Sequence, residues 1–153
     1  GSFHMGAGLN PQLLRAVRGV DIFKGFSQDD IVKIFSHCQT MNVQKDQMVF
    51  QKGAVGNQMF VVLGGSFGLW DGSRQLATFH TGDTFGEMSL LLHEPRVGTV
   101  KALEFSQVCV LDETLFQKLL TKRVAVQLLL NISSVLARRL QGANRSIREL
   151  EGR

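Results

Sequence analysis

The sequence predicts a mostly β fold with flanking helices, built as an antiparallel β-barrel or jelly roll. Between Met41 and Leu111, short apolar runs with a period near two alternate with glycine-containing turns. The segments before and after this region carry helical periodicity instead. The chain has 153 residues, of which 44% are hydrophobic and 16 are glycines. That composition suits one compact soluble domain with tightly cornered strands around a single core.

Two helical segments are expected before the strands. Asn10-Pro11 marks the start of the first, which covers Gln12 to Val20, because proline is favoured at the first helical position. Ser27 is expected to cap the second, where Asp29 and Asp30 follow in the first turn. The apolar positions of this second helix recur at helical spacing, at Ile31, Ile34, Phe35 and Cys38.

The strands of the predicted barrel are short and separated by turn residues. Asp71-Gly72 is a strong hairpin signal, because this pair favours the tight turns that join antiparallel strands. Trp70 beside it is interpreted as sheet packing. The expected strands lie within 41–43, 48–50, 59–63, 66–70, 75–80, 99–103 and 105–111.

After Leu111 the pattern becomes helical again. One helix is expected from Thr114 to Leu120, and a long helix without proline from Val124 onward. Gly142 interrupts the long helix and predicts a hinge or a close contact. An apolar stripe follows one face of this helix, at Ile132, Leu136, Leu140, Ala143, Ile147 and Leu150. If the stripe is not buried on the barrel, the domain should self-associate through it.

The distribution of charge and of apolar residues narrows the classes of function. Through Gln117 the balance of charges is −2, and from Lys118 to the end it is +6. We interpret this basic excess as the solvated face of a helix, since no aromatic residues interleave it, and expect no direct binding of nucleic acid. No apolar run is long enough to insert into a membrane.

The cysteines and histidines give no sign of a metal site. Cys38 and Cys109 are interpreted as free, buried thiols in a reducing compartment. The histidines are scattered without partners at ligand spacing, so we expect no metal, no cofactor and no catalytic residues. A metal enzyme on a similar barrel would need clustered ligands that this pattern does not supply.

The residues best suited to binding a ligand lie in the stretch from Phe85 to Val100. Gly86 allows a close backbone approach before a short helix, whose first N–H groups and dipole favour an anion. One or two helical turns are expected, ended by Pro95. Arg96 can donate two hydrogen bonds to a phosphate, and Glu87 can accept them from a sugar hydroxyl. An anion cradle beside a hydroxyl acceptor indicates a sugar phosphate or nucleotide.

These residues resemble the phosphate-binding cassette of cyclic nucleotide-binding domains. The motif is Phe85-Gly86-Glu87-Met88-Ser89-Leu90 followed by Pro95-Arg96-Val97-Gly98-Thr99-Val100, and the resemblance extends from about Val20 to about Asn144. It implies that Arg96 binds the cyclic phosphate, that Glu87 binds the ribose 2′-hydroxyl, and that backbone N–H groups assist, with Gly86 and Ser89 favoured. The expected ligand-binding residues are Phe85, Gly86, Glu87, Met88, Ser89, Arg96, Val97, Thr99 and Asn144.

Alternatives stay open for these roles. Arg96 could instead pair with Glu94 or Glu87, Glu87 could only complement a helix dipole, and the stretch could be a crossover in an unrelated barrel. Val97 lacks the hydroxyl that relatives preferring cGMP often place there, which favours cAMP. Ala143 departs from the family's base-covering pair, so Asn144 is the expected base contact, with Arg139 as an alternative through stacking.

The resemblance implies one domain over residues 9–153, after an opening of residues 1–8 that we interpret as a cloning remnant. Its parts would be helices over 9–40, a barrel with the cassette over 41–112, and C-terminal helices over 113–153. The long C-terminal helix would act as a lid over the ligand. We expect a cytoplasmic regulatory module that binds a cyclic nucleotide, moves its C-terminal helix, acts on an output domain, and forms a homodimer through that helix. The alternatives are a ligand-independent interaction module and the sensor half of a transcription regulator.

Overall fold

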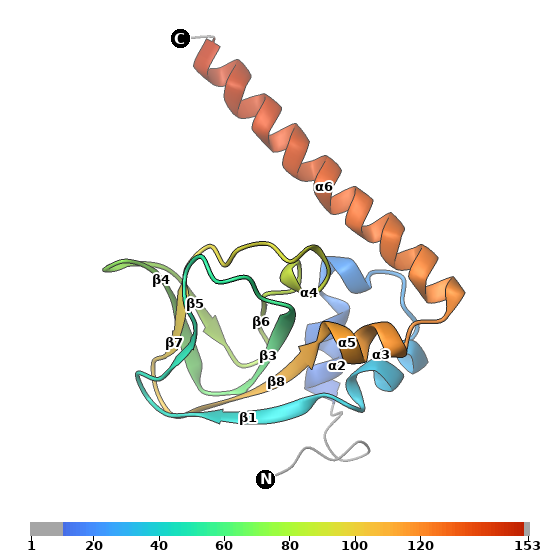
Figure 1. The fold of residues 1–153 in the computed structure, drawn as a ribbon, viewed down its shortest axis with the longest axis horizontal. Coiled ribbons are helices and arrows are strands. Elements are labelled where there is room, and N and C mark those ends of the chain that lie inside the picture. The colour runs from blue at the N-terminus through green and yellow to red at the C-terminus, as the bar shows by residue number, and fades with distance from the viewer. Residues whose placement is uncertain (1–10, 152–153) are drawn as a thin grey trace.

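A computed structural model describes residues 11–151 of the chain (Figure 1). Two four-stranded antiparallel sheets form the body, with strand orders β1-β8-β3-β6 and β2-β7-β4-β5. The strands are β1 (Gln39–Val43), β2 (Met48–Phe50), β3 (Gln58–Gly64), β4 (Ser66–Asp71), β5 (Arg74–His80), β6 (Thr84–Phe85), β7 (Thr99–Ala102) and β8 (Ser106–Asp112). The helices are α2 (Pro11–Arg18), the 3₁₀ helix η1 (Asp21–Phe23), α3 (Gln28–Phe35), α4 (Ser89–Leu92), α5 (Glu113–Lys118) and α6 (Lys122–Glu151).

This architecture confirms the predicted jelly roll with flanking helices. The predicted cloning remnant and the helix-start signal at Asn10 lie outside the described residues. Most strands fall where the period-two pattern placed them, and the Asp71-Gly72 turn joins β4 to β5. The two-residue strand β6 was not predicted, because a pairing this short leaves no periodicity in the sequence.

Strand β3 is buried on both faces, which explains its unbroken apolar run. Phe60 and Val62 point into the space between the sheets, where they join one core cluster. Met59 and Val61 belong to a second cluster, in which the helices pack on the outer face of the sheet. A strand with no solvated face cannot alternate apolar and polar residues. The barrel therefore carries its helical layer on the β3–β8 side.

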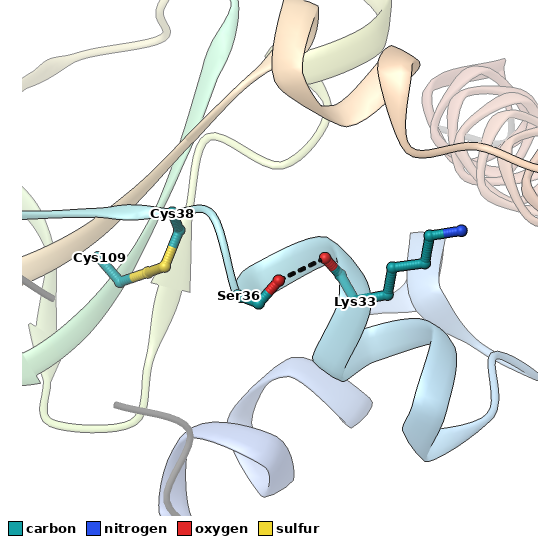
Figure 2. The surroundings of a disulfide bond; sticks show 4 residues. All are labelled: Lys33, Ser36, Cys38 and Cys109. Atoms are coloured by element: carbon teal, nitrogen blue, oxygen red, sulfur yellow. Dashed lines mark hydrogen bonds between the residues drawn. A yellow bond between two sulfur atoms is a disulfide. The ribbon is translucent and has the colours of Figure 1, made fainter. Parts of the chain in front are cut away.

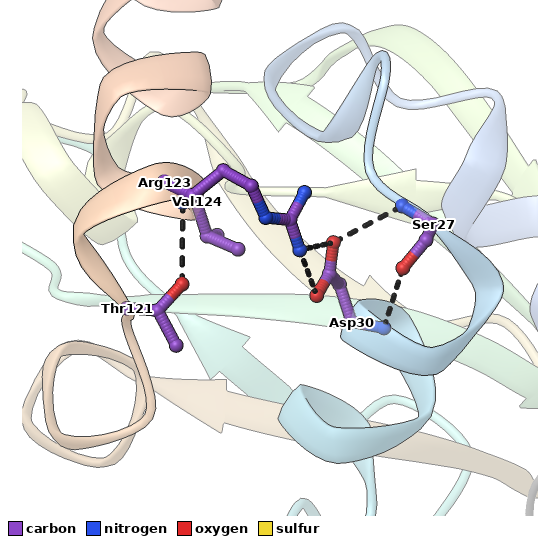
Figure 3. A network of polar contacts seen from close by, with 5 residues as sticks. All are labelled: Ser27, Asp30, Thr121, Arg123 and Val124. Carbon is purple, nitrogen blue, oxygen red and sulfur yellow. Dashed lines mark hydrogen bonds and ion pairs between the residues drawn. The ribbon is translucent and has the colours of Figure 1, made fainter.

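The start of α3 and the start of α6 are joined by the network of Figure 3. Ser27 Oγ accepts from the Asp30 backbone N–H at 3.1 Å, and the Asp30 carboxylate accepts from the Ser27 N–H at 3.2 Å. This capping box confirms Ser27 as the cap of α3. Arg123 of α6 donates to both carboxylate oxygens of Asp30, at 3.1 and 3.2 Å. Burial raises the pKa of Asp30, but the hydrogen bonds from Ser27 and the charge of Arg123 outweigh it, and the pKa lies below its ordinary value.

Helix α6 docks its first half on η1 and projects its second half away from the barrel (Figure 1). Val124 and Leu128 are buried in the helical core, and Asn131 Nδ2 donates to the carbonyls of Ile22 and Lys24 at 2.9 and 2.8 Å. The helix continues through Gly142, and no atom lies within 4 Å of a Cβ built there. The predicted interruption and close contact at Gly142 are therefore wrong, because neighbouring helix formers outweigh one glycine. No helix within residues 11–151 is long and apolar enough to cross a membrane.

The two cysteines form a disulfide, which corrects the prediction of free thiols. Cys38 follows α3 and Cys109 lies in β8, with their Cα atoms 6.1 Å apart (Figure 2). Both side chains are buried, as predicted. The error arose because the cysteines are 71 residues apart in the sequence, and only the pairing of β1 with β8 brings them together. The bond ties the end of the N-terminal helical unit to the strand that leads into α5.

Candidate nucleotide-binding site

The cassette occupies the connection between β6 and β7. Gly86 adopts a φ of +80°, which an L side chain tolerates poorly, so glycine is required where the chain leaves β6. The helical part is a single turn, α4, that ends at Leu92. It ends before Pro95 because His93 turns into the left-handed region with a φ of 53°. The His93 ring also contacts the Glu113 carboxylate at the start of α5.

Phe85 fixes the base of the cassette in the barrel core. Its ring stacks on Phe60 at 5.0 Å and on Phe79 at 4.9 Å between centroids. Burial of an aromatic ring on this scale contributes about 1.5–3 kcal/mol to folding. Phe85 therefore packs in the barrel core, and it also lines the cavity described next.

A cavity of about 250 Å³ opens between the cassette and the barrel. Its floor is apolar, and its charged groups are Glu87, Glu94, Arg96 and Arg139. The lining residues are Phe50, Leu69, Phe79, Thr84, Phe85, Gly86, Glu87, Met88, Ser89, Glu94, Pro95, Arg96, Val97, Val100 and Arg139. An apolar hollow with a few convergent polar groups is the usual form of a small-molecule site.

Arg96 is held rigidly at the back of this cavity. Its backbone N–H donates to Ala54 O at 2.9 Å, and its carbonyl accepts from Gly53 N at 2.8 Å. Its guanidinium lies over the Phe50 ring at 4.1 Å, and Nη2 donates to Gln58 O at 3.0 Å. A Cβ at Gly56 would overlap the guanidinium, and one at Gly86 would lie 2.6 Å from Nη1. The two glycines therefore leave room for the arginine.

The guanidinium of Arg96 is buried but incompletely paired. Only 7% of the residue is exposed, yet Nε and Nη1 have no hydrogen-bond partner. Desolvation lowers the pKa of Arg96 from its ordinary value, although an arginine remains charged. The described residues give it no carboxylate partner, so the alternative pairing with Glu94 or Glu87 is not formed. A buried cation with two open donors is costly on its own and favours an anion in the cavity.

Glu87 lines the same cavity. Burial raises the pKa of its carboxyl above the ordinary value of 4.5, and repulsion by Asp21 acts in the same direction. Its own backbone N–H and the charge of Arg139 act in the opposite direction. The carboxylate is thus partly desolvated and placed where it can accept a hydrogen bond from a ligand hydroxyl.

The remaining predicted residues divide into those at the cavity and those outside it. Met88, Ser89 and Val97 line the cavity, and Val97 is 72% exposed. The Ser89 N–H already donates to Gly86 O at 3.1 Å, and its hydroxyl donates to Glu94 O at 3.3 Å. Thr99 lies just beyond the lining, where its hydroxyl accepts from Lys52 N at 3.0 Å. Asn144 is exposed on α6 and does not line the cavity.

Arg139 reaches the cavity from α6, five residues before Asn144. Its Nη1 donates to the Glu94 carboxylate at 2.6 Å. The sequence offered Arg139 only as an alternative, because the reach of a helix residue depends on how the helix crosses the barrel. The sequence reasoning missed Phe50 and Gln58, which hold Arg96, since an aromatic residue or a backbone carbonyl in a strand carries no specific signal.

Comparison with known proteins agrees with this geometry. The family model described as cyclic nucleotide-binding domain matches residues 40–123, which is more than half of the chain. The chain belongs to the cyclic nucleotide-binding domain family. This cyclic nucleotide-binding domain is 29% identical over 117 residues to the cGMP-dependent protein kinase egl-4 of Caenorhabditis briggsae, covering 76% of the chain and 16% of the kinase. The chain thus spans about a sixth of that relative.

Solved structures show the same fold. The N-terminal domain of a transcriptional regulator from Streptomyces coelicolor A3(2) superposes with a TM-score of 0.71 and 24% identity, covering 86% of this chain and 94% of that one. The Thermus thermophilus Catabolite Activator Protein superposes with a TM-score of 0.66 and 26% identity, covering 86% of this chain and 63% of that one. The predicted family is confirmed, and the matched part of the chain is a cyclic nucleotide-binding domain.

Proposed function

We propose that this domain binds a cyclic nucleotide, cAMP in preference to cGMP, in the cavity between the cassette and the barrel. The observation that carries the proposal is the buried guanidinium of Arg96, which has two unpaired donors and belongs to a residue that lines the same cavity as Glu87. A cyclic phosphate would accept from Arg96, and the ribose 2′-hydroxyl would donate to Glu87. The expected backbone donors and the base contact at Asn144 stay part of this proposal.

The preference for cAMP rests on Val97. This residue lines the cavity and is largely exposed, but its side chain has neither donor nor acceptor. A hydroxyl at this place would offer the guanine amino group a hydrogen bond, and valine does not. A neutral hydrogen bond contributes about 0.5–1.5 kcal/mol, so we expect a preference of about threefold to tenfold.

Signalling would follow from the position of α6. Its first half is anchored on η1 and α3, and Arg139 on its second half reaches the cavity. If the nucleotide binds more tightly to the conformation in which α6 holds one position than to the conformation in which it holds another, it shifts the population toward the first. The movement of α6 would then act on an output domain of the parent protein. This output domain, whether a kinase, a channel or a DNA-binding part, is also proposed, and it is not among the residues that the structure describes.

A titration of the purified domain with cAMP and with cGMP tests the proposal. Isothermal calorimetry should show binding of both, tighter for cAMP, and Arg96→Ala should weaken both about tenfold to hundredfold, because charged hydrogen bonds contribute about 1.5–3 kcal/mol. Arg74→Ala is the matched control, since Arg74 is exposed at the start of β5. If neither nucleotide binds the wild-type domain at millimolar concentration, the sensor function is wrong and an interaction module takes its place.

We also propose that a second copy of the chain pairs with α6. Along the outer face of this helix, positions 126, 129, 133, 136, 140, 143, 147 and 150 follow alternating steps of three and four residues. The large apolar residues among them are exposed: Val126, Leu129, Leu136, Leu140, Ile147 and Leu150. Such a repeat over three heptads is the seam of a two-stranded coiled coil, and it lies away from the face that docks on η1. The homodimer thus uses most of the predicted stripe but not Ile132, which is half-buried against the helical core.

A further inference from the structure

A second hollow shares two lining residues with the nucleotide cavity. It has a volume of about 450 Å³ and lies between the end of α2 and the turn that joins β5 to β6. Its described lining residues are Arg15, Ala16, Gly19, Val20, Phe79, Gly82, Asp83 and Thr84. Phe79 and Thr84 also line the nucleotide cavity, but among the described residues none from 85–100 or from α6 lines this hollow. Its volume falls within the range of about 300–1,000 Å³ that is usual for small-molecule sites.

The lining of the hollow carries one group of each charge, on two different elements. Arg15 belongs to α2, and Asp83 belongs to the turn between β5 and β6. Among residues 11–151 no ion pair joins these two groups, and the exposed Arg15 guanidinium pairs with no other carboxylate. Two opposite charges that line one hollow without meeting suit a molecule that carries both a carboxylate and an ammonium group.

Asp83 is the fixed member of the two. Its Oδ2 accepts from the His80 N–H at 2.8 Å, and its backbone N–H donates to His80 O at 2.9 Å. Its carbonyl accepts from Val62 N at 2.9 Å, and the turn is completed by Gly82, which adopts a φ of +92°. Within the described residues, the second carboxylate oxygen of Asp83 has no hydrogen bond. A carboxylate that is held in place with one oxygen open can accept from an ammonium group at little cost in entropy.

The rest of the lining is mostly apolar. Val20 follows α2 and is 7% exposed, and Ala16 lies within α2. The Phe79 ring stacks on Phe85, with 4.9 Å between centroids. An apolar group packed here would remove this surface from water, which is favourable. The hollow therefore fits a small zwitterion with an apolar side chain.

We propose that this hollow is a second small-molecule site, which takes a free amino acid with an apolar side chain and raises the affinity of the nucleotide cavity. The carboxylate of the amino acid would accept from Arg15, its ammonium group would donate to Asp83, and its side chain would pack on Phe79. Each charged group of the protein would thus gain a partner of opposite charge.

The two sites are linked through their shared wall. Phe79 stacks on Phe85, which comes directly before Gly86 and the rest of the cassette. An occupant that holds the Phe79 ring in place therefore also orders the base of the nucleotide cavity, so the nucleotide has less to order when it binds. The linkage rests on the proposed function, whereas the second site does not. It is also reciprocal, because the nucleotide must raise the affinity for the amino acid by the same factor.

An NMR titration of the isotope-labelled domain with L-phenylalanine tests the site. We expect a Kd of about 1 mM, which suits a small ligand in an open hollow, and shifts of the Gly19 and Gly82 amide signals. Phenylpropionate lacks the ammonium group and phenethylamine lacks the carboxylate, so each should bind at least about tenfold more weakly. Saturating phenylalanine should lower the Kd for cAMP about fivefold, as measured by calorimetry.

Variants of the lining separate the individual contacts. Asp83→Asn keeps an acceptor for the His80 N–H but removes the charge, and Arg15→Gln removes the exposed cation. Each should weaken phenylalanine binding about tenfold. Gly19→Leu adds a side chain to the lining without backbone strain, because Gly19 has no positive φ and its nearest Cβ contact is an ordinary 3.5 Å, and it should block the site. Arg18→Gln is the matched control, since Arg18 is exposed on α2 and does not line the hollow.

The outcomes separate the second site from the nucleotide site. Phenylalanine binding should survive Arg96→Ala, and its loss in that variant would place the amino acid in the nucleotide cavity and overturn the second site. Unshifted Gly19 and Gly82 signals at about 10 mM phenylalanine would overturn it as well, and so would equal weakening by Arg18→Gln and Arg15→Gln. An unchanged affinity for cAMP in saturating phenylalanine would overturn the linkage. A domain that binds phenylalanine but neither nucleotide would refute the proposed function and leave the second site standing.

Discussion

At the scale of single residues, Arg96 dominates the site because its surroundings are arranged around its guanidinium. Phe50 covers one face of the plane, Gln58 O takes one donor, and the absence of a Cβ at Gly56 and Gly86 leaves the space in which it lies. A charge-bearing group fixed before the ligand arrives loses little entropy on binding. Preorganisation of Arg96 is therefore the property that a substitution should test, in addition to its charge.

Gly56→Ala tests this preorganisation without removing the arginine. The new methyl group would overlap the guanidinium, and Gly56 has no positive φ, so the change acts by displacing Arg96 and not by backbone strain. We expect nucleotide affinity to fall about tenfold or more, since a displaced guanidinium loses at least one charged hydrogen bond. Calorimetric titration measures this loss. Gly64→Ala is the control, because no atom lies within 4 Å of its Cβ, and equal affinities in the two variants would contradict the prediction.

Glu87 makes a second residue-scale prediction, which concerns pH. Because burial raises the folded-state pKa of Glu87 above 4.5, the charged carboxylate disfavours the ligand-free fold, and this cost is relieved as pH falls through the folded-state pKa. Glu87→Gln should therefore raise the free energy of unfolding at neutral pH while weakening nucleotide binding. The stabilisation should disappear below about pH 4, where the Glu87 carboxyl of the wild type is largely protonated in both the folded and the unfolded state. Urea unfolding at the two pH values measures it, and a destabilised Glu87→Gln at neutral pH would refute it.

At the scale of elements, local signals predicted what local interactions determine. The capping residue Ser27, the Asp71-Gly72 turn and the apolar run of β3 all act within a few residues, and the structure confirms them. The disulfide, the two-residue strand β6 and the reach of Arg139 into the cavity depend on contacts between distant segments. A single sequence does not encode those contacts in its periodicity. The motif of the cassette was recognisable because its residues are close together in the chain.

The disulfide gives the prediction at this scale. Cys38–Cys109 joins the helical unit to β8 across 71 residues, so its reduction frees a long loop in the unfolded chain. We expect reduction to lower the free energy of unfolding by about 4 kcal/mol. Urea unfolding with and without a thiol reductant measures the difference. The double variant Cys38→Ala, Cys109→Ala should show no dependence on reductant. Two titratable thiols in denatured, unreduced protein would contradict the bond.

At the scale of the whole molecule, α6 links three surfaces. Its inner face docks on η1 and α3 (Figure 1). Arg139 reaches the cavity, and the outer face of α6 carries the exposed apolar seam. A helix of 30 residues is about 45 Å long, so its far half has room for a partner without covering the barrel. A nucleotide that moves α6 would therefore also move whatever is paired along its seam, which connects the cavity to quaternary structure.

Leu140→Glu tests that connection. Leu140 is 63% exposed and lies at the middle of the seam, next to Arg139 but on a different face of α6. In a coiled-coil dimer both copies bury this leucine, and losing two such contacts, at about 1.5–3 kcal/mol each, should raise the dimer dissociation constant at least a hundredfold. Sedimentation over a range of concentrations measures it. Gln141→Glu adds a negative charge at the adjacent, exposed position outside the seam and should leave the dimer intact. A wild-type domain that stays monomeric at high concentration, with and without nucleotide, would show that the seam serves no second copy.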